Sequence, residues 1–161
     1  ISILRPATVC GLTPRMRFDL SVNMLTYQAL KNKQINVFGG KQIRPNIHID
    51  DLMDVYLFFL NKGNKYNGIF NAGFENLSIL EIAKNIQKVI TSKIVITRNV
   101  NDIRSYRIDS TKLLKLGFYP KKNIKNAINE INDYYLNKIN KVKKNCFSLE
   151  WLKANQSKFF K

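Results

Sequence analysis

The side chains of this sequence that are best suited to binding chemistry are two arginines, Arg44 and Arg104. A guanidinium group is planar, keeps its charge and can donate two parallel hydrogen bonds to phosphate oxygens. Each arginine lies in a polar segment beside a short β-branched run, Arg44 before one run and Arg104 after another. We expect the two arginines, which lie in loops far apart in the sequence, to converge on one anion.

Two further residues could complete such a site, Asn23 and Asp102. Asn23 lies near the start of an expected helix, where free N–H groups and the helix dipole favour an anion. Asp102 could accept a hydrogen bond from a ribose hydroxyl, or it could stabilise a turn through its own backbone. Both interpretations of Asp102 stay open at the level of the sequence.

His48 and the two cysteines indicate structural roles. His48 alternates with two isoleucines, which is more typical of a hydrogen-bonded structural histidine than of a catalyst. Cys10 and Cys146 stand far apart, without a second Cys or His at ligand spacing, so neither a zinc site nor a disulfide is indicated. Nothing near Cys10 in the sequence would lower the pKa of its thiol, so we expect a buried, inert residue. This cysteine usage fits a reducing, cytoplasmic setting.

Hydrophobic periodicity predicts the elements that position these residues. We expect one buried strand over 1–10 and a helix over 19–31 with Asp19 as its cap. An amphipathic helix is expected to begin at Asp50, with an apolar face made of Leu52, Val55, Tyr56, Phe59 and Leu60. Residues 78–81 have the pattern of a capping box, which predicts a third helix start. The remaining expected elements are strands at 35–38, 47–49, 69–71 and 94–97 and helices at 110–116 and 124–139.

Strands that alternate with helices indicate an α/β domain. The strands at 1–10 and 69–71 are almost wholly apolar, which is typical of parallel strands that are covered on both faces. We therefore expect these two strands to belong to one parallel sheet. The helices of this chain alone are not expected to cover that sheet.

Three stretches, Leu4–Gly11, Phe38–Leu52 and Asn101–Pro120, carry a resemblance to a known family. They are similar to the strand-to-loop passage, the arginine-containing segment and the closing segment of NAD-dependent epimerases and dehydratases, which are extended short-chain dehydrogenases that act on nucleotide sugars. Cys10 stands where the family usually has Tyr, and Pro45 where Asp is common. The resemblance covers about residues 1–135.

The resemblance implies an α/β fold in which a C-terminal substrate-binding lobe joins the last strands of a Rossmann-type parallel sheet. Residues 1–140 would form this part, and residues 141–161 would be a basic C-terminal tail. The implied cofactor is NAD or NADP, with Pro6 and Thr8 beside the nicotinamide. The implied substrate is a nucleotide-diphosphate sugar for surface polysaccharide, bound by Asn23, Arg44, Asp102 and Arg104. The full-length protein would be a homodimer.

The family's glycine-rich phosphate loop and its catalytic Tyr-x-x-x-Lys pair are expected to precede Ile1. Tyr134 and Lys138 have the spacing of that pair, but their place on a terminal helix beside a second tyrosine indicates surface packing. The chain opens with neither an initiator Met nor a signal peptide, so Ile1 is expected to be a truncation point. We therefore expect the chain to lack the dinucleotide-binding half and to be inactive alone.

The formal net charge of +16 raises an alternative, a non-catalytic basic module that binds a sugar nucleotide or a nucleic acid. The excess of cations is spread along the chain, and the aromatic pairs at 58–59 and 134–135 fall on expected helix faces. Single-strand binding would instead need aromatic side chains interleaved with cations. No apolar run approaches the roughly 20 residues of a membrane span. We expect neither a nucleic acid nor a membrane partner.

Overall fold

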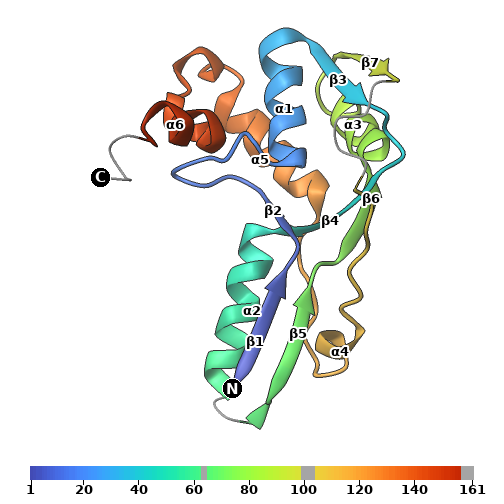
Figure 1. Cartoon of the computed structure of the whole chain (residues 1–161), viewed down its shortest axis with the longest axis vertical. Helices are drawn as coiled ribbons and strands as arrows, with labels where there is room; N and C mark the ends of the chain where they lie inside the picture. The colour runs from blue at the N-terminus through green and yellow to red at the C-terminus, as the bar shows by residue number, and fades with distance from the viewer. Residues whose placement is uncertain (63–64, 99–103, 157–161) are drawn as a thin grey trace.

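The computed structural model describes residues 1–62, 65–98 and 104–156. Asp102 lies outside these ranges. One end of the molecule holds β1, β5, α2 and α4, and the other holds α1, α3, α5 and α6 with β3 and β7, while β2, β4 and β6 connect the two (Figure 1). The strands are β1 Ser2–Pro6, β2 Thr8–Cys10, β3 Gln34–Phe38, β4 Ile43–His48, β5 Gly68–Ala72, β6 Glu75–Ser78 and β7 Lys93–Thr97. The helices are α1 Ser21–Asn32, α2 Ile49–Lys62, α3 Ile79–Gln87, α4 Thr111–Leu114, α5 Ile124–Tyr135 and α6 Ser148–Ala154.

The strands form three small sheets, and the α/β fold class expected from the sequence is confirmed. β1 pairs with β5 and β3 pairs with β7, both in parallel, and β4 lies between parallel β2 and antiparallel β6. The single strand expected over 1–10 is wrong, because the chain changes partner at Ala7. Pro6 has no N–H to donate to a ladder, and the run divides there into β1 and β2.

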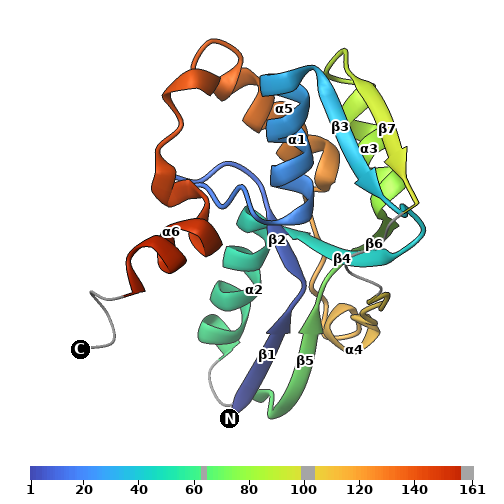
Figure 2. The ribbon, with the colours of Figure 1, turned by 45° about the horizontal axis from the view of Figure 1, so that its top comes forward.

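Around β1 and β5, α2 covers one face of the two-stranded sheet (Figure 2). Val55 and Phe59 of α2 are buried, and the Phe59 ring lies 4.9 Å from the ring of Phe70 on β5. Tyr56 and Leu60, which the sequence also assigned to the apolar face, are 44% and 74% exposed. The packed face of α2 is therefore narrower than its sequence pattern predicts.

At the other end, α1 packs against α3 and α5 in the larger of the two apolar cores. Phe18, which is 1% exposed, contacts the rings of Tyr27, Tyr135 and Phe147 at centroid distances of 4.9, 5.4 and 5.9 Å. The backbone N–H of Phe18 also donates to the carbonyl of Cys146 over 2.9 Å. The region expected as a basic tail thus contributes buried side chains to this core before it reaches α6.

The structure confirms one of the two helix caps expected from the sequence and contradicts the other. The capping box is confirmed, because the Ser78 Oγ accepts from the N–H of Glu81 over 3.2 Å and Glu81 accepts from the N–H of Ser78 over 2.7 Å. The cap expected at Asp19 is wrong, since Leu20 is the cap of α1 and its side chain makes no capping bond. Asp19 forms an ion pair with Arg17 instead, over 2.8 Å.

Within the described residues, none of the helices combines the length and the apolar character that crossing a bilayer requires.

Candidate functional site: an arginine-lined pocket

A pocket of about 240 Å³ opens where the start of α1, β3 and the beginning of β4 meet. Its walls combine apolar side chains from α1, β3 and α3 with polar side chains and one guanidinium group. The lining residues are Asp19, Ser21, Met24, Leu25, Asn36, Phe38, Gln42, Arg44 and Ile79. An apolar floor with a few convergent polar groups is typical of a small-molecule site.

Arg44 lies in this pocket, next to the segment that contains Arg104. One guanidinium nitrogen of Arg44 donates to the backbone carbonyl of Arg104, and the Arg44 guanidinium lies 5.6 Å from the centre of the Tyr106 ring. The N–H of Ile43 donates to the Ser105 hydroxyl over 3.0 Å, which fixes the two segments side by side. The expected position of Arg44 in a loop is wrong, because the strand β4 already begins at Ile43. The fold thus brings the start of β4 beside the irregular segment that contains Arg104, 60 residues away. Binding of one anion by both arginines stays a prediction.

The start of α1 adds a second feature that suits an anion. The Oγ of Ser21, in the first turn, is buried and has no hydrogen-bond partner among the described residues. The N-terminal N–H groups of this helix also lack a side-chain cap and an acidic residue in the first turn. Unsatisfied donors at a helix N-terminus attract anions. Ser21 was not predicted from the sequence, since one serine before an apolar run carries no distinctive signal.

Asp19 lies at the same helix start and would oppose an anion if its charge were uncompensated. Burial is the largest single influence and disfavours the ionised form, but the hydrogen bonds from Arg17 and from the backbone, together with the charges of Arg17 and Arg15, outweigh it and lower the pKa of Asp19. The carboxylate is therefore ionised and paired at neutral pH. Its charge is offset by a guanidinium only two residues away.

Asn23, expected to contact the substrate, is 4% exposed and does not line the pocket. Its amide oxygen accepts from the N–H of Gly11 over 3.3 Å, and its amide nitrogen donates to the carbonyl of Arg17 over 3.2 Å. Asn23 therefore ties the loop between β2 and α1 to the helix. Its role in substrate binding stays a prediction, whereas Ser21 lines the pocket.

Pro6 and Thr8, expected near the cofactor, lie at the carboxyl end of β1 and the start of β2. Pro6 is exposed, and it stands in register with Ala72 at the carboxyl end of the parallel strand β5. Ligands of open α/β sheets bind beyond the carboxyl ends of parallel strands. The position of these two residues therefore fits a cofactor contact, which stays a prediction.

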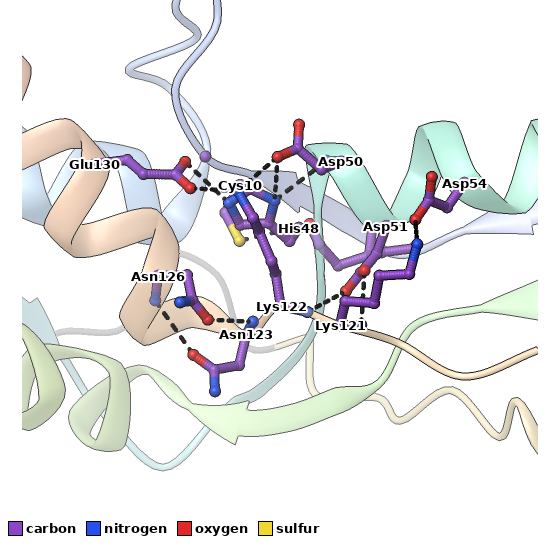
Figure 3. Close-up of polar contacts among 12 residues, drawn as sticks. Cys10, His48, Asp50, Asp51, Asp54, Lys121, Lys122, Asn123, Asn126 and Glu130 are labelled. Atoms are coloured by element: carbon purple, nitrogen blue, oxygen red, sulfur yellow. Dashed lines mark hydrogen bonds and ion pairs between the residues drawn. The ribbon is translucent and has the colours of Figure 1, made fainter.

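His48 is a fully buried structural residue (Figure 3). Its Nδ1 accepts from the backbone N–H of Asp50 over 3.1 Å, so the proton of the neutral ring is assigned to Nε2. Nε2 lies 3.0 Å from a carboxylate oxygen of Glu130 on α5 and donates to it. His48 thus links α2 to α5, as expected for a satisfied histidine.

His48, Asp50 and Glu130 bring three possible metal-ligand atoms within 4.8 Å of one another. The ammonium group of Lys122 already bonds to both carboxylates, over 2.6 Å to Asp50 and 2.7 Å to Glu130. These bonds, first the one to Asp50, raise the pKa of Lys122. The cluster in Figure 3 is therefore an ion-pair network with its own cation. This network could not be predicted from the sequence, because its members come from distant segments.

Cys10 is buried beside this network, and burial raises the pKa of its thiol to about 12, with smaller contributions from Glu75, Glu130 and Asp51. The thiolate fraction at pH 7 is then on the order of 10⁻⁵. We expect iodoacetamide at pH 7 to leave Cys10 of the folded protein unmodified and to modify it after denaturation in urea, as peptide mass spectrometry would show. A Tyr119→Cys variant, at a position 75% exposed, is the positive control. Rapid modification of folded Cys10 would contradict its inert role.

Two Tyr-x-x-x-Lys pairs occur in the chain, and both are engaged in packing. The Lys138 ammonium lies 4.3 Å from the centre of the Tyr134 ring, which is a cation–π contact. In the second pair, on α1, Tyr27 packs on Phe18 and Phe147 while Lys31 donates to Asn140. Burial raises the pKa of Tyr27, whereas a catalytic tyrosine requires a pKa closer to neutrality.

A family model described as "NAD dependent epimerase/dehydratase family" matches residues 1–73. An ADP-L-glycero-D-manno-heptose-6-epimerase of Brachyspira hyodysenteriae is 40% identical over 68 residues, which are 40% of this chain and 21% of that protein. A putative GDP-L-fucose synthase 2 of Arabidopsis thaliana is 24% identical over 110 residues, which are 66% of this chain. The chain spans about a third of the length of that relative, 34%.

The fold is shared with solved structures over most of this chain. The UDP-glucuronic acid 4-epimerase of Bacillus cereus, solved in complex with UDP-glucuronic acid and NAD, matches 89% of this chain and 46% of its own, with a TM-score of 0.70 and 28% identity. The dTDP-glucose 4,6-dehydratase of Bacillus anthracis, solved with NAD, matches 85% of this chain with a TM-score of 0.70 and 19% identity. Residues 1–73 therefore match the NAD dependent epimerase/dehydratase family model, and the fold that contains them is the one found in solved nucleotide-sugar epimerases and dehydratases.

Proposed function

We propose that this chain is the sugar-nucleotide-binding part of an NAD(P)-dependent nucleotide-sugar epimerase or dehydratase of surface polysaccharide biosynthesis. The observation that carries the proposal is the pocket in which Arg44 and the uncapped start of α1 lie on an apolar floor. The UDP-glucuronic acid 4-epimerase of Bacillus cereus, which has the same fold, was solved with UDP-glucuronic acid, and this supports the same class of ligand here. A cytoplasmic location and a homodimer belong to the same proposal.

The pocket offers complementary surfaces for the two ends of a nucleoside diphosphate. Met24, Leu25, Phe38 and Ile79 provide an apolar bed for a base, and Asn36 and Gln42 line the same pocket with amide groups. Arg44 and the free donors of α1 suit the diphosphate, because charge-assisted hydrogen bonds to phosphate are about twice as strong as neutral ones.

The cofactor would lie beyond the carboxyl ends of β1 and β5, near Pro6 and Thr8. Bound there, NAD(P) would supply hydride acceptor and donor chemistry for a sugar carbon. The residues of this chain hold the substrate through its diphosphate, so that the sugar is oriented by groups that do not react. The proton-transferring pair belongs to the half of the enzyme that this chain does not supply.

The test is calorimetric titration of the purified chain with UDP, GDP, ADP and dTDP, followed by an activity assay with the matching sugar nucleotides and NAD. We expect at least one nucleoside diphosphate to bind and no turnover to occur. Failure of all four to bind at millimolar concentration would remove the proposed site. Turnover by the chain alone would contradict the proposal that the proton-transferring pair lies outside this chain.

A further inference from the structure

A second pocket, of about 390 Å³, lies at the C-terminal side of the molecule. It is formed by the loop between β2 and α1, the end of α5 and the segment that leads from α5 to α6. Its lining residues are Pro14, Arg15, Tyr134, Tyr135, Lys138, Lys141, Val142, Lys143, Asn145 and Cys146. None of them also lines the pocket that contains Arg44. The two pockets are therefore separate, and we call the second one the C-terminal basic pocket.

Four cationic side chains line the C-terminal basic pocket, and no carboxylate is among its lining residues. The four cations are Arg15, Lys138, Lys141 and Lys143. Within the described residues none of them forms a salt bridge, whereas Lys121 and Lys122 pair with carboxylates elsewhere on the surface. Cations that share one concave surface repel each other and focus a positive potential there. A multivalent anion would offset this repulsion.

Arg15 is held in place through one of its three guanidinium nitrogens. Nη2 donates to the carbonyl of Asn145 over 3.1 Å and to the hydroxyl of Ser148 over 3.3 Å. Figure 1 shows the loop between β2 and α1 reaching the C-terminal segment here. Asp19 interacts electrostatically with Arg15 but forms its ion pair with Arg17. Among the described residues, Nε and Nη1 of Arg15 have no hydrogen-bond partner, so these donors remain for a ligand.

The three lysines of the pocket are positioned by regular backbone rather than by a free tail. The Lys138 ammonium lies 4.3 Å from the centre of the Tyr134 ring, a cation–π contact that favours this position. Lys141 ends one 3₁₀ turn, Ile139–Lys141, and Lys143 immediately precedes another, Lys144–Cys146. The same segment contributes buried side chains to the larger core. The fold therefore brings these cations together with Arg15, which lies more than a hundred residues earlier.

We propose that the C-terminal basic pocket binds a phosphate-bearing ligand with at least two negative charges, through Arg15 and the three lysines. A phosphate group concentrates charge on one compact centre and accepts hydrogen bonds from several directions, which suits a guanidinium group and ammonium groups that come from different segments. Two sources share this chemistry: a free phosphate compound and the headgroup of an anionic phospholipid. The proposal does not rest on the proposed function.

A single-stranded nucleic acid is the less suitable ligand, because its bases need open aromatic faces on which to stack. The Lys138 ammonium lies over the Tyr134 ring, and Tyr135 is only 9% exposed. A closed volume of about 390 Å³ also suits a compact group better than a polymer. We therefore expect the pocket to discriminate by phosphate charge rather than by base stacking.

The first arm of the test is calorimetric titration of the purified chain with inorganic pyrophosphate. The variant Lys138→Gln/Lys141→Gln/Lys143→Gln should raise the dissociation constant at least about tenfold, because it removes several charge-assisted bonds. It changes exposed side chains only and leaves the structural bonds of Arg15 intact. The matched control is Lys84→Gln/Lys88→Gln/Lys115→Gln, which removes the same charge from exposed positions outside the pocket. Arg44→Ala is the second control and should leave this dissociation constant unchanged.

The second arm is flotation of the chain with phosphatidylcholine vesicles that contain phosphatidic acid, compared with phosphatidylcholine alone. Retention by phosphatidic acid that pyrophosphate displaces and the pocket variant loses would support the site and assign a lipid headgroup. Binding of pyrophosphate without retention by either vesicle would support the site and assign a free phosphate compound.

Three results would overturn the proposal. The first is that neither probe binds at millimolar phosphate. The second is that both triple variants weaken binding equally, which would show general attraction to a basic protein. The third is that a single-stranded oligonucleotide binds more tightly than pyrophosphate and loses its binding in the pocket variant. Because Arg44→Ala alters only the pocket at the start of α1, failure of either site is distinguishable from failure of the other.

Discussion

Arg44→Ala is expected to raise the dissociation constant for a nucleoside diphosphate about ten- to a hundredfold. A charge-assisted hydrogen bond is worth about 1.5–3 kcal/mol, and each 1.4 kcal/mol corresponds to a factor of ten in affinity. Arg44 supplies the guanidinium group of the pocket. The dissociation constant of Arg44→Lys should lie between those of the wild type and Arg44→Ala, because lysine keeps the charge but lacks the planar guanidinium group. The measurement is calorimetric titration with the nucleotide that binds best.

The controls for Arg44 are Lys141→Ala and Lys143→Ala, which remove single cations that do not line the pocket. These variants change the net charge as much as Arg44→Ala does, so they separate a local contact from the general attraction of a basic protein for an anion. In an enzyme completed by its dinucleotide-binding half, Arg44→Ala should leave the affinity for NAD unchanged. Equal weakening by all three variants would show that the binding is non-specific.

Phe18→Ala is expected to lower the free energy of unfolding by about 3–5 kcal/mol. Phe18 is 1% exposed and its ring contacts three other aromatic rings from α1, α5 and the C-terminal segment. The substitution leaves a cavity between elements that are distant in sequence, so they cannot close it by a local shift. Urea denaturation followed by circular dichroism measures the change.

Tyr119→Ala is the matched control for Phe18, because Tyr119 is 75% exposed and should change the stability by no more than about 0.5 kcal/mol. A loss below about 1 kcal/mol for Phe18→Ala would mean that the C-terminal segment does not pack on this ring in solution. The result therefore also tests whether residues 144–154 are part of the folded domain.

The sequence by itself determined the kind of fold and most of its elements. Local signals were sufficient where a short sequence pattern specifies one local structure. Examples are the Ser78–Glu81 capping box, the buried face of α2 at Val55 and Phe59, and the alternation of strands with helices. The family resemblance likewise depended on short segments whose order is visible in the sequence. Arg44 could be proposed as a phosphate ligand because it stands in the segment that resembles the family's arginine-containing segment and because a guanidinium group suits phosphate.

Only the tertiary structure decided which distant groups share a site and which faces remain open. Ser21 became a candidate because its hydroxyl is buried without a partner among the described residues. Asn23 does not line the pocket, and its amide is hydrogen-bonded to the backbone of Gly11 and Arg17. The periodicity of α2 shows which residues are apolar but not which of its sides another layer covers. Packing between segments far apart in the chain sets these outcomes, and its energy depends on three-dimensional proximity, which neither propensity nor periodicity encodes.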